Sequence, residues 1–430
     1  MIDETVRDEV RRVAESARAA SSALGQTTAG ERNRALIAMA RALREHAADI
    51  IAANGRDMDA AREAGTKESL LDRLMLDESR VEAMACALED LVVLPDPLGC
   101  VQDERQLYNG IELTRVSVPL GVVAVVYEAR PNVTADAAGI CLKSGNAAVL
   151  RGGSLASASN EAVARVLHDA AVSAGMPQGC IGLIASTDRA AADELMQLHG
   201  VIDVLIPRGG AGLIRHCVEH SKVPVIETGT GNCHVYVHAT ADLEMARAIV
   251  LNAKCRRYGV CNAAETLLID EAAAEVMLPR LLADLQAKGV LLHADECALR
   301  VARAHGIKAE AAVEQDWATE YLAPEMAVKC VGGVDEAIDH VNRYGTRHSE
   351  AIVADPTDAE GAAALEAFLN RVDAAAVYAN ASTAFTDGGQ FGLGAEIGIS
   401  TQKLHARGPF ALAALTSYKY VLRGTGQVRA

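Results

Sequence analysis

The segment Leu251–Asp270, LNAKCRRYGVCNAAETLLID, places two cysteines beside an arginine pair. A cysteine thiolate is a strong nucleophile where positive charge or backbone N–H groups lower its pKa. Cys261 comes shortly after Gly259 and before an apolar run, so we expect it in a turn that precedes a strand. Most cysteines are small buried hydrophobic residues, and Cys255 is the local rival. The pattern favours Cys261 as a catalytic nucleophile.

Two glycine loops each follow an apolar strand and open a helix. The first loop is Arg151-Gly152-Gly153-Ser154, and the second is Arg208-Gly209-Gly210-Ala211-Gly212. Free N–H groups at a helix N-terminus can bind phosphate, and arginine suits the 2′-phosphate of NADP. Neither loop matches the dinucleotide or P-loop fingerprint, so each can also be a plain tight connection. Two such loops in consecutive units favour a phosphate site.

Other polar residues follow predicted strands or lie in late loops. Asn132 follows a buried strand, where its amide can stabilise an oxyanion or cap the next helix. Glu227 is a strand-end carboxylate, either a general base or a structural acceptor. His405 and Arg407 can bind a carboxylate, although a surface loop is the commoner explanation. No Cys, His or Asp set has metal-ligand spacing, so we expect no metal.

The elements that must position these residues begin with helices. Apolar spacing predicts two helices over residues 3–54. Asn109-Gly110 between alternating residues predicts a β-hairpin over 107–118, which should pair with another subunit or another part of the chain. From Gly121 onward strands and helices alternate, which predicts a parallel, doubly wound sheet. The fold class is therefore α/β.

The second half begins at a glycine-rich turn. Residues 223–237 predict two strands around that turn, and residues 243–252 predict a helix before the cysteines. Residues 265–270 predict a strand after them, and residues 414–422 form a strand-like segment near the end. The cysteine segment is therefore expected between a helix and a buried strand.

Composition limits the class of protein. The 430 residues are 50% hydrophobic, enough for two large domains, and the formal net charge is −16. Such a charge argues against nucleic acid, and an anionic substrate would require a locally basic pocket. Ten cysteines without CxxC pairs indicate reduced thiols in a cytoplasmic protein. No apolar run reaches the roughly 20 residues of a membrane span.

Several motifs together resemble the aldehyde dehydrogenase superfamily and, within it, the gamma-glutamyl phosphate reductase family. The motifs are YEARPNVT (127–134), LKSGNAAVLRGGS (142–154), IPRGG (206–210), IETGTGNCHVYV (226–237), NAKCRRYGVCNAAETLL (252–268), GAEIGISTQKLHARGPFAL (394–412) and SYKY (417–420). Relatives commonly carry proline before the glycine of the cysteine loop, where this chain has Tyr258. No kinase pattern precedes the motifs, so we expect the unfused form of the enzyme.

The resemblance implies a domain plan. Residues 1–104 and 119–227 would form a Rossmann-type NADPH-binding domain, and residues 228–404 the catalytic domain. Residues 105–118 and 411–424 would form oligomerisation strands. A homodimer or homotetramer is expected, as in the superfamily.

The resemblance also implies roles for individual residues. Cys261 matches the nucleophile, Asn132 the oxyanion donor, and Glu227 the general base of hydrolytic relatives. Glu320 falls where relatives hold the cofactor ribose, and Arg151 where they meet the adenosine ribose or its 2′-phosphate. The predicted cofactor contacts are Arg151, Gly152, Gly153, Ser154, Arg208, Gly209, Gly210 and Glu320. The candidates for a basic substrate pocket are Arg130, Arg257, His405 and Arg407.

The implied reaction is NADPH-dependent reduction of L-glutamyl 5-phosphate to L-glutamate 5-semialdehyde through a thioacyl enzyme. The supplying glutamate 5-kinase is a possible partner. A hydrolytic NAD(P)-dependent aldehyde dehydrogenase is the alternative enzyme, and a catalytically silent NADP-binding relative is a third interpretation.

Overall fold

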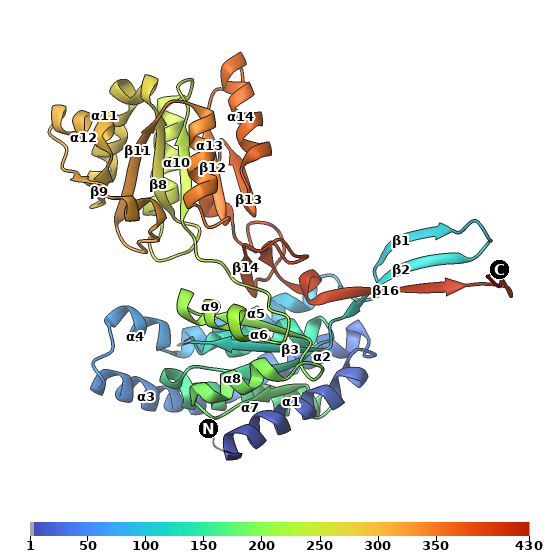
Figure 1. Ribbon diagram of the computed structural model, residues 1–430. Coiled ribbons are helices and arrows are strands. Elements are labelled where there is room, and N and C mark those ends of the chain that lie inside the picture. The colour runs from blue at the N-terminus through green and yellow to red at the C-terminus, as the bar shows by residue number, and fades with distance from the viewer. Residues whose placement is uncertain (1–3, 129, 430) are drawn as a thin grey trace. The chain divides into compact units, whose positions relative to one another are not determined.

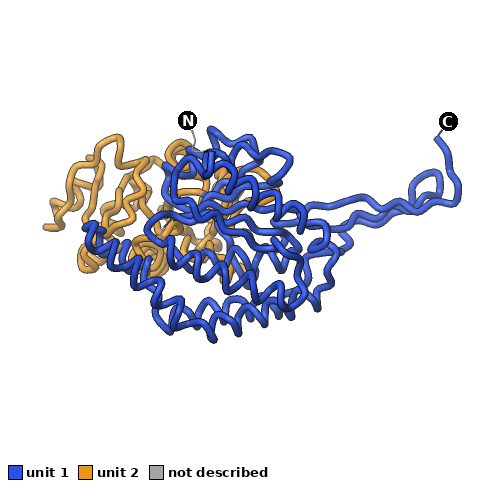
Figure 2. Tube along the Cα trace, turned by 90° about the horizontal axis from the view of Figure 1, so that it is seen from below, with its two compact units in different colours: residues 1–228, 393–398, 410–430 blue, residues 229–392, 399–409 orange. Residues whose placement is uncertain are grey.

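The chain folds into two compact units. The computed structural model describes residues 4–128 and 130–429 (Figure 1). Unit 1 comprises Met1–Thr228, Leu393–Gly398 and Phe410–Ala430, and unit 2 comprises Gly229–Gly392 and Ile399–Pro409 (Figure 2). No helix in the described part of the chain is long and apolar enough to cross a membrane.

Unit 1 begins with five helices. They are α1 (Glu4–Leu24), α2 (Ala29–Glu45), α3 (Ala47–Glu63), α4 (Glu68–Leu74) and α5 (Glu78–Val93). A capping box starts α2, because Thr28 and Glu31 exchange side-chain and backbone hydrogen bonds. The prediction of two helices over residues 3–54 was wrong, since His46 separates α2 from α3. No glycine or proline lies at this break. The apolar residues therefore keep their helical spacing across His46, and the pattern does not reveal that the helix ends there.

Four parallel strands form the sheet of unit 1 in the order β5-β4-β3-β6. The strands are β3 (Val122–Tyr127), β4 (Ala147–Arg151), β5 (Ile181–Leu183) and β6 (Val204–Arg208). The accompanying helices are α6 (Asn132–Lys143), α7 (Ser157–Ser173), α8 (Arg189–Gln197) and α9 (Ala211–His220). The order of winding reverses between β3 and β6, and α/β sheets bind ligands at the carboxyl ends of strands beside such a switch point.

A three-stranded antiparallel sheet also belongs to unit 1 (Figure 1). It contains β1 (Val101–Gln106), β2 (Glu112–Pro119) and β16 (Thr416–Arg423), in the order β1-β2-β16. The Asn109-Gly110 turn was predicted correctly, but the first strand precedes Leu107 rather than beginning there. The hairpin pairs with β16 of the same chain, which was one of the two expected outcomes.

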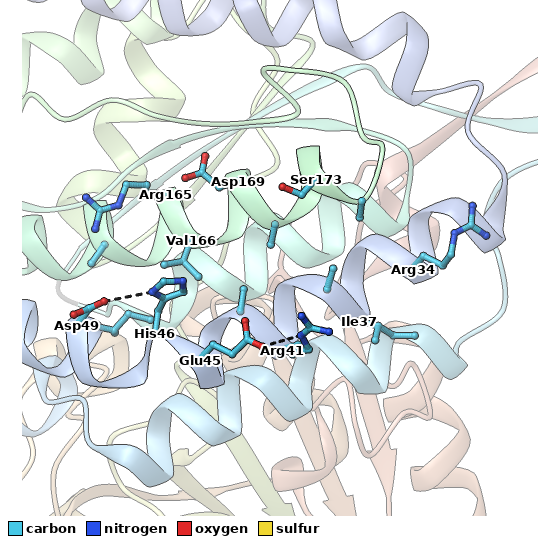
Figure 3. A pocket seen from close by; sticks show the side chains of 16 residues that line it. Arg34, Ile37, Arg41, Glu45, His46, Asp49, Arg165, Val166, Asp169 and Ser173 are labelled. Carbon is cyan, nitrogen blue, oxygen red and sulfur yellow. Dashed lines mark hydrogen bonds and ion pairs between the residues drawn. The ribbon is translucent and has the colours of Figure 1, made fainter.

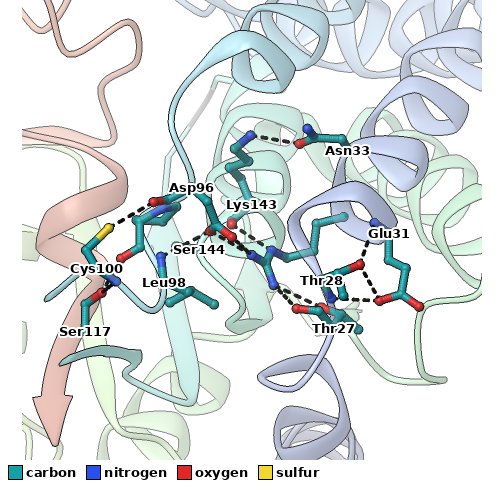
Figure 4. Close-up of polar contacts among 12 residues, drawn as sticks. Thr27, Thr28, Glu31, Asn33, Asp96, Leu98, Cys100, Ser117, Lys143 and Ser144 are labelled. Atoms are coloured by element: carbon teal, nitrogen blue, oxygen red, sulfur yellow. Dashed lines mark hydrogen bonds and ion pairs between the residues drawn. The ribbon is translucent and has the colours of Figure 1, made fainter.

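A buried arginine fixes the segment that leads into this sheet (Figure 4). The side chain of Arg32 on α2 is 1% exposed and donates to both carboxylate oxygens of Asp96, at 2.7 and 2.8 Å. It also donates to the carbonyl of Lys143, at the end of α6. Asp96 in turn accepts the N–H of Leu98 at 3.1 Å. This contact ties α2 and α6 to the connection that precedes β1.

Unit 2 is built on a seven-stranded sheet in the order β10-β9-β11-β8-β7-β12-β13, in which every pairing is parallel. The strands are β7 (Cys233–Val237), β8 (Ala264–Asp270), β9 (Leu291–Ala294), β10 (Glu310–Ala311), β11 (Glu325–Val331), β12 (Ser349–Val353) and β13 (Ala376–Ala379). The helices are α10 (Leu243–Cys255), α11 (Glu271–Ala287), α12 (Glu296–Ala304), α13 (Val334–Tyr344) and α14 (Ala359–Arg371). Short strands β14 (Gly398–Ser400) and β15 (Gly408–Phe410) pair with each other.

Two further expectations need correction. Residues 223–237 contain one strand, β7, because Val225 makes only an isolated bridge to Leu205. The helix before the cysteines ends at Cys255 rather than at Asn252, so Cys255 is helical. Glu227 therefore does not lie at the end of a strand.

Candidate active site

Cys261 lies in a tight turn between α10 and β8. The N–H of Ala263 donates to the carbonyl of Val260 at 3.1 Å, which makes Cys261 the second of four turn residues. Its side chain is half-buried, and β8 begins at Ala264, just after the turn. The expectation of Cys261 in a turn before a buried strand is confirmed.

The backbone of this turn is held by residues far away in the sequence. The Cys233 thiol donates to the carbonyl of Cys261 at 3.2 Å, and burial raises the pKa of Cys233 well above its ordinary value. The Asn262 amide donates to the carbonyl of Thr386 at 3.0 Å, and the Thr383 hydroxyl donates to the carbonyl of Asn262 at 2.8 Å. The peptide groups beside the thiol are therefore fixed by two other segments of unit 2.

Gly231 leaves room for the Cys261 peptide. A Cβ at this position would lie only 1.4 Å from the carbonyl oxygen of Cys261. The N–H of Gly231 donates to a carboxylate oxygen of Glu320 at 2.6 Å. Burial raises the pKa of Glu320 above its ordinary value. Cys261 and Glu320, two predicted site residues, thus contact the same glycine.

Cys255 has different surroundings. It occupies the end of α10 and packs against the apolar core of unit 2. Burial raises the pKa of its thiol, and a hydrogen bond with Tyr258 offsets only part of this effect. A thiol of raised pKa carries little thiolate at neutral pH. The local environment therefore favours Cys261 over Cys255 as the nucleophile.

Asn132 is the first residue of α6, after β3. Pro131 is the N-cap residue, so the helix-cap alternative for Asn132 was wrong. The Asn132 side chain is exposed, and its amide donates to a carboxylate oxygen of Asp136 at 3.0 Å. Burial raises the pKa of Asp136 to about 6. One amide N–H is committed to Asp136, which leaves the second to donate to a ligand.

The first glycine loop leads from β4 through a short 3₁₀ turn, Ser154–Ala156, into α7. Arg151 is mostly buried, and its guanidinium donates to the carbonyls of Thr187 and Asp188 at 2.8 and 2.9 Å. Its Nε has no hydrogen-bond partner within the described chain. Beside this loop is a cavity of about 140 Å³, lined by Gly152, Ser157, Asn160, Glu161, Leu183, Ile184, Ala185 and Thr187.

The second glycine loop joins β6 to α9 and already holds an anion. The N–H of Gly210 donates to a carboxylate oxygen of Glu128 at 3.0 Å. A Cβ on Gly209 would lie 2.7 Å from the same carboxyl group, so glycine permits this close approach. The helix N-terminus thus binds an internal carboxylate, and a phosphate placed there must displace Glu128.

A groove in unit 1 contains none of the predicted site residues. It measures about 710 Å³ and lies among α2, α3 and α7 (Figure 3). Arg41 pairs with Glu45, and His46 pairs with Asp49, along its exposed rim. Its charges of both signs and open shape indicate no particular ligand.

Comparisons with known proteins identify the family of this chain. Residues 2–296 match the aldehyde dehydrogenase family. The gamma-glutamyl phosphate reductase of Moorella thermoacetica is 55% identical over 421 residues, which cover 98% of this chain and 99% of the relative. The crystal structure of that enzyme from Thermotoga maritima superimposes with a TM-score of 0.95 at 43% identity, covering 98% of this chain and 100% of the other.

The chain belongs to the gamma-glutamyl phosphate reductase family. This membership confirms the predicted family, the aldehyde-dehydrogenase-like α/β fold and the class of oxidoreductases. Aldehyde dehydrogenases use NAD or NADP, so the cofactor class is a nicotinamide dinucleotide. An engineered glycolyl-CoA reductase solved with bound NADP+ shares the fold, with a TM-score of 0.66 at 16% identity.

The predicted site residues of this reductase family member are divided between the units. Those in unit 1 are Arg130, Asn132, Arg151, Gly152, Gly153, Ser154, Arg208, Gly209, Gly210 and Glu227. Those in unit 2 are Arg257, Cys261, Glu320, His405 and Arg407. Glu227 is half-buried, while Arg130, Arg257 and His405 are exposed.

Arg407 is less available for a substrate than the sequence suggested. Its guanidinium donates to Asp373 at 2.7 Å, and Lys403 forms an ion pair with the same carboxylate at 2.8 Å. These contacts, led by the one with Lys403, hold the pKa of Asp373 below its ordinary value. Part of the positive charge in this loop is therefore offset within the protein.

Sequence reasoning missed several residues around the nucleophile turn. Cys233 and Thr383 donate to carbonyls of the turn, and the side chain of Asn262, within the turn, donates to the segment 384–386. Lys254 and Glu265 form a fully buried ion pair on either side of the turn. The glutamate within the apolar run AAETLLID was a visible signal, because charged residues are almost never fully buried unless paired. The other partners lie too far apart in the sequence to be recognised.

Proposed function

We propose that this chain uses NADPH to reduce L-glutamyl 5-phosphate to L-glutamate 5-semialdehyde and phosphate, the second step of proline biosynthesis from glutamate. The observation that carries the proposal is the half-buried Cys261 in a turn that is fixed on both sides. Membership in the reductase family supports the substrate class.

The chemistry follows from a thiol and an acyl phosphate. The Cys261 thiolate attacks the acyl carbon, and the carbonyl electron pair moves onto oxygen. The amide of Asn132 and the N–H of Cys261 donate to this oxyanion, and losing one such donor costs about 3–4 kcal/mol of barrier. Collapse of the adduct breaks the bond to phosphate and leaves a thioester on Cys261. NADPH, when bound, would supply the hydride that reduces the acyl group to the aldehyde level. The C–S bond then breaks, which releases the aldehyde and returns the electron pair to the Cys261 thiolate.

The residues of unit 1 fit a dinucleotide. The cavity beside Gly152 has polar lining from Ser157 and Asn160. Arg151, whose Nε is unpartnered, ends β4, and Gly210, whose N–H would become a donor once Glu128 is displaced, follows β6; these two strands flank β3. We assign Arg151, Gly152, Gly153, Ser154, Arg208, Gly209 and Gly210 to the cofactor, with Glu320 contacting its ribose. The preference for NADPH over NADH is part of the proposal.

The remaining assignments concern charge. Arg130, Arg257, His405 and Arg407 would bind the phosphate and the α-carboxylate of the substrate against the net charge of −16. Because hydride rather than water attacks the thioester, no general base is needed to activate water. Glu227, which matches that base in hydrolytic relatives, therefore has the least defined role. The ten cysteines carry reduced thiols, which supports a cytoplasmic location.

The three-stranded sheet suits assembly with further copies of this chain. Strands β1 and β16 are its edges, and Tyr418, Tyr420 and Leu422 on β16 are about half exposed. Exposed apolar residues on an unpaired edge favour pairing with another chain. We assign this sheet to oligomerisation, with a dimer or tetramer as the product, and regard the kinase that forms the acyl phosphate as a partner in the pathway.

The deciding experiment measures oxidation of L-glutamate 5-semialdehyde by NADP+ with and without inorganic phosphate. We expect turnover only with phosphate, because phosphate must attack the thioester to release the product. Turnover that does not depend on phosphate would instead establish the hydrolytic alternative.

Two cysteine variants test the nucleophile. Cys261→Ala should abolish turnover and retain NADP+ binding, whereas Cys255→Ala should remain active because that thiol packs on the core. Binding of NADP+ without turnover by the wild-type protein would favour a catalytically silent relative. Normal turnover by Cys261→Ala would shift the assignment to Cys255.

A further inference from the structure

A fully buried ion pair lies at the base of the loop that carries Cys261. The ammonium of Lys254 and a carboxylate oxygen of Glu265 are 2.5 Å apart, and neither side chain is exposed. Lys254 is in the last turn of α10, and Glu265 is the second residue of β8. The pair therefore joins the two ends of the segment 255–264.

Burying two charges is costly, so this pair needs explanation. A buried ion pair is seldom more stabilising than apolar residues of the same volume, although removing one partner is strongly destabilising. Burial raises the pKa of Glu265 to about 7 and lowers that of Lys254, and their mutual attraction opposes both shifts. Stability alone gives little reason for these two residue types here.

The second carboxylate oxygen of Glu265 reaches another segment. It accepts the N–H of Leu322 at 3.2 Å. Leu322 has a φ of 53°, a left-handed conformation that is uncommon for a residue other than glycine. The ammonium of Lys254 lies 5.9 Å from the ring centre of Tyr321. The ion pair thus binds the backbone N–H of Leu322 through Glu265 and lies over the ring of Tyr321 through Lys254.

This segment leads back to the nucleophile. Glu320, the preceding residue, accepts the N–H of Gly231, and the backbone of Gly231 packs directly on the Cys261 peptide. The contacts form a continuous series from Glu265 through residues 320–322 and Gly231 to Cys261. Glu265 also returns to Cys261 along the chain itself, only four residues away.

We propose that Lys254 and Glu265 are positioning residues that close the Cys261 loop and set the place of its thiol for attack on the acyl group. The role in the reaction rests on the proposed function of Cys261. The role in placing the thiol is independent of which substrate the enzyme uses.

Four variants and one control test the proposal. Glu265→Gln keeps an acceptor for Leu322 but removes the charge, and a Lys254→Met, Glu265→Leu double variant replaces the pair with apolar residues. Lys254→Arg keeps the positive charge at this position, whereas Lys254→Met removes it. Asp335→Asn, which removes the carboxylate of an exposed ion pair with Arg371 in the same unit, is the matched control.

The first readout is the rate at which iodoacetamide alkylates Cys261, followed by mass spectrometry of its peptide because the chain has ten thiols. The second readout is steady-state kinetics, which measures kcat and the KM for NADP+ separately. A displacement of about 1 Å at a reacting group lowers the rate about 100-fold. We expect kcat to fall by that order in Glu265→Gln and in the double variant, with a changed alkylation rate. The KM for NADP+ should change by a smaller factor, because Glu320 is the one assigned cofactor contact linked to this pair. Lys254→Arg should retain more activity than Lys254→Met, and Asp335→Asn should match the wild type.

The proposal is overturned if the double variant folds and alkylates Cys261 at the wild-type rate with wild-type kcat. Should the double variant not fold, equal kcat and alkylation rates for Lys254→Arg and Lys254→Met would overturn it as well. Failure of the proposed function is distinguishable, because it would appear as turnover by Cys261→Ala while the alkylation readout of the wild-type thiol remains.

Discussion

Replacing Gly231 with alanine is the sharpest test of how the nucleophile is held. The added Cβ would lie 1.4 Å from the carbonyl oxygen of Cys261, whereas real Cβ contacts are not shorter than 3.0 Å. Its nearest neighbours are all backbone atoms of Cys261, so no side chain can rotate away to relieve the clash. The turn that carries the thiol, or the segment that carries Gly231, must move.

The size of the effect follows from that distance. The two backbones must separate by at least 1.6 Å, the difference between 3.0 and 1.4 Å. A misplacement of about 1 Å lowers a rate about 100-fold, so we expect kcat to fall at least that far, or by about 2.7 kcal/mol of barrier. Overpacking of this kind costs about 1–3 kcal/mol of folding stability, which leaves the chain folded.

The assay combines steady-state oxidation of L-glutamate 5-semialdehyde with NADP+ titration and thermal unfolding. The loss should appear in kcat, while NADP+ binding persists, because the predicted contacts to the phosphates of the cofactor lie in unit 1. Gly332→Ala is the matched control in unit 2, where a Cβ would meet only the flexible carboxylate of Glu336 at 3.4 Å. Wild-type kcat in a folded Gly231→Ala enzyme would refute the reasoning, since the Cys261 turn would then tolerate a large displacement.

Three further predictions concern stability and assembly. Asp96→Ala removes the carboxylate partner of the buried Arg32 guanidinium. It should lower the free energy of unfolding by about 3 kcal/mol, measured by urea denaturation against the wild type. Asp136 has a pKa of about 6 in the folded chain against an ordinary 3.8, so its stabilising contribution is present below pH 3.8 and is lost as the pH rises through 6. Asp136→Asn should remove that loss, which is at most about 3 kcal/mol; an unchanged pH profile of unfolding would contradict the assignment. Tyr420→Glu, on the exposed edge strand β16, should shift light-scattering mass towards the monomer, and an unchanged mass would argue against this edge as the interface.

Local patterns predicted most elements of the fold. The strand at Val122–Tyr127 is recognisable because six consecutive apolar residues have to be buried on both faces of a parallel sheet. The Asn109-Gly110 turn is recognisable because glycine adopts the left-handed backbone that such turns need, here with a φ of 83° at Gly110. The break at His46 could not be foreseen, since it depends on how two helices pack rather than on a residue that ends helices.

The sequence by itself determined the fold class and the family, and it favoured Cys261 over nine other cysteines as the predicted nucleophile, because short motifs and turn chemistry are local properties. Only the tertiary structure decided what surrounds that thiol. Cys233 and Thr383 contact the turn from distant positions, and Glu320 binds the N–H of Gly231, which packs on it. A carboxylate from Glu128 occupies the N–H of a predicted phosphate loop. Such contacts depend on strand order and register, which bring together residues that no spacing along the chain relates. Cys261 could be predicted as the nucleophile from its own neighbours in sequence, but the groups that hold its turn in place could not.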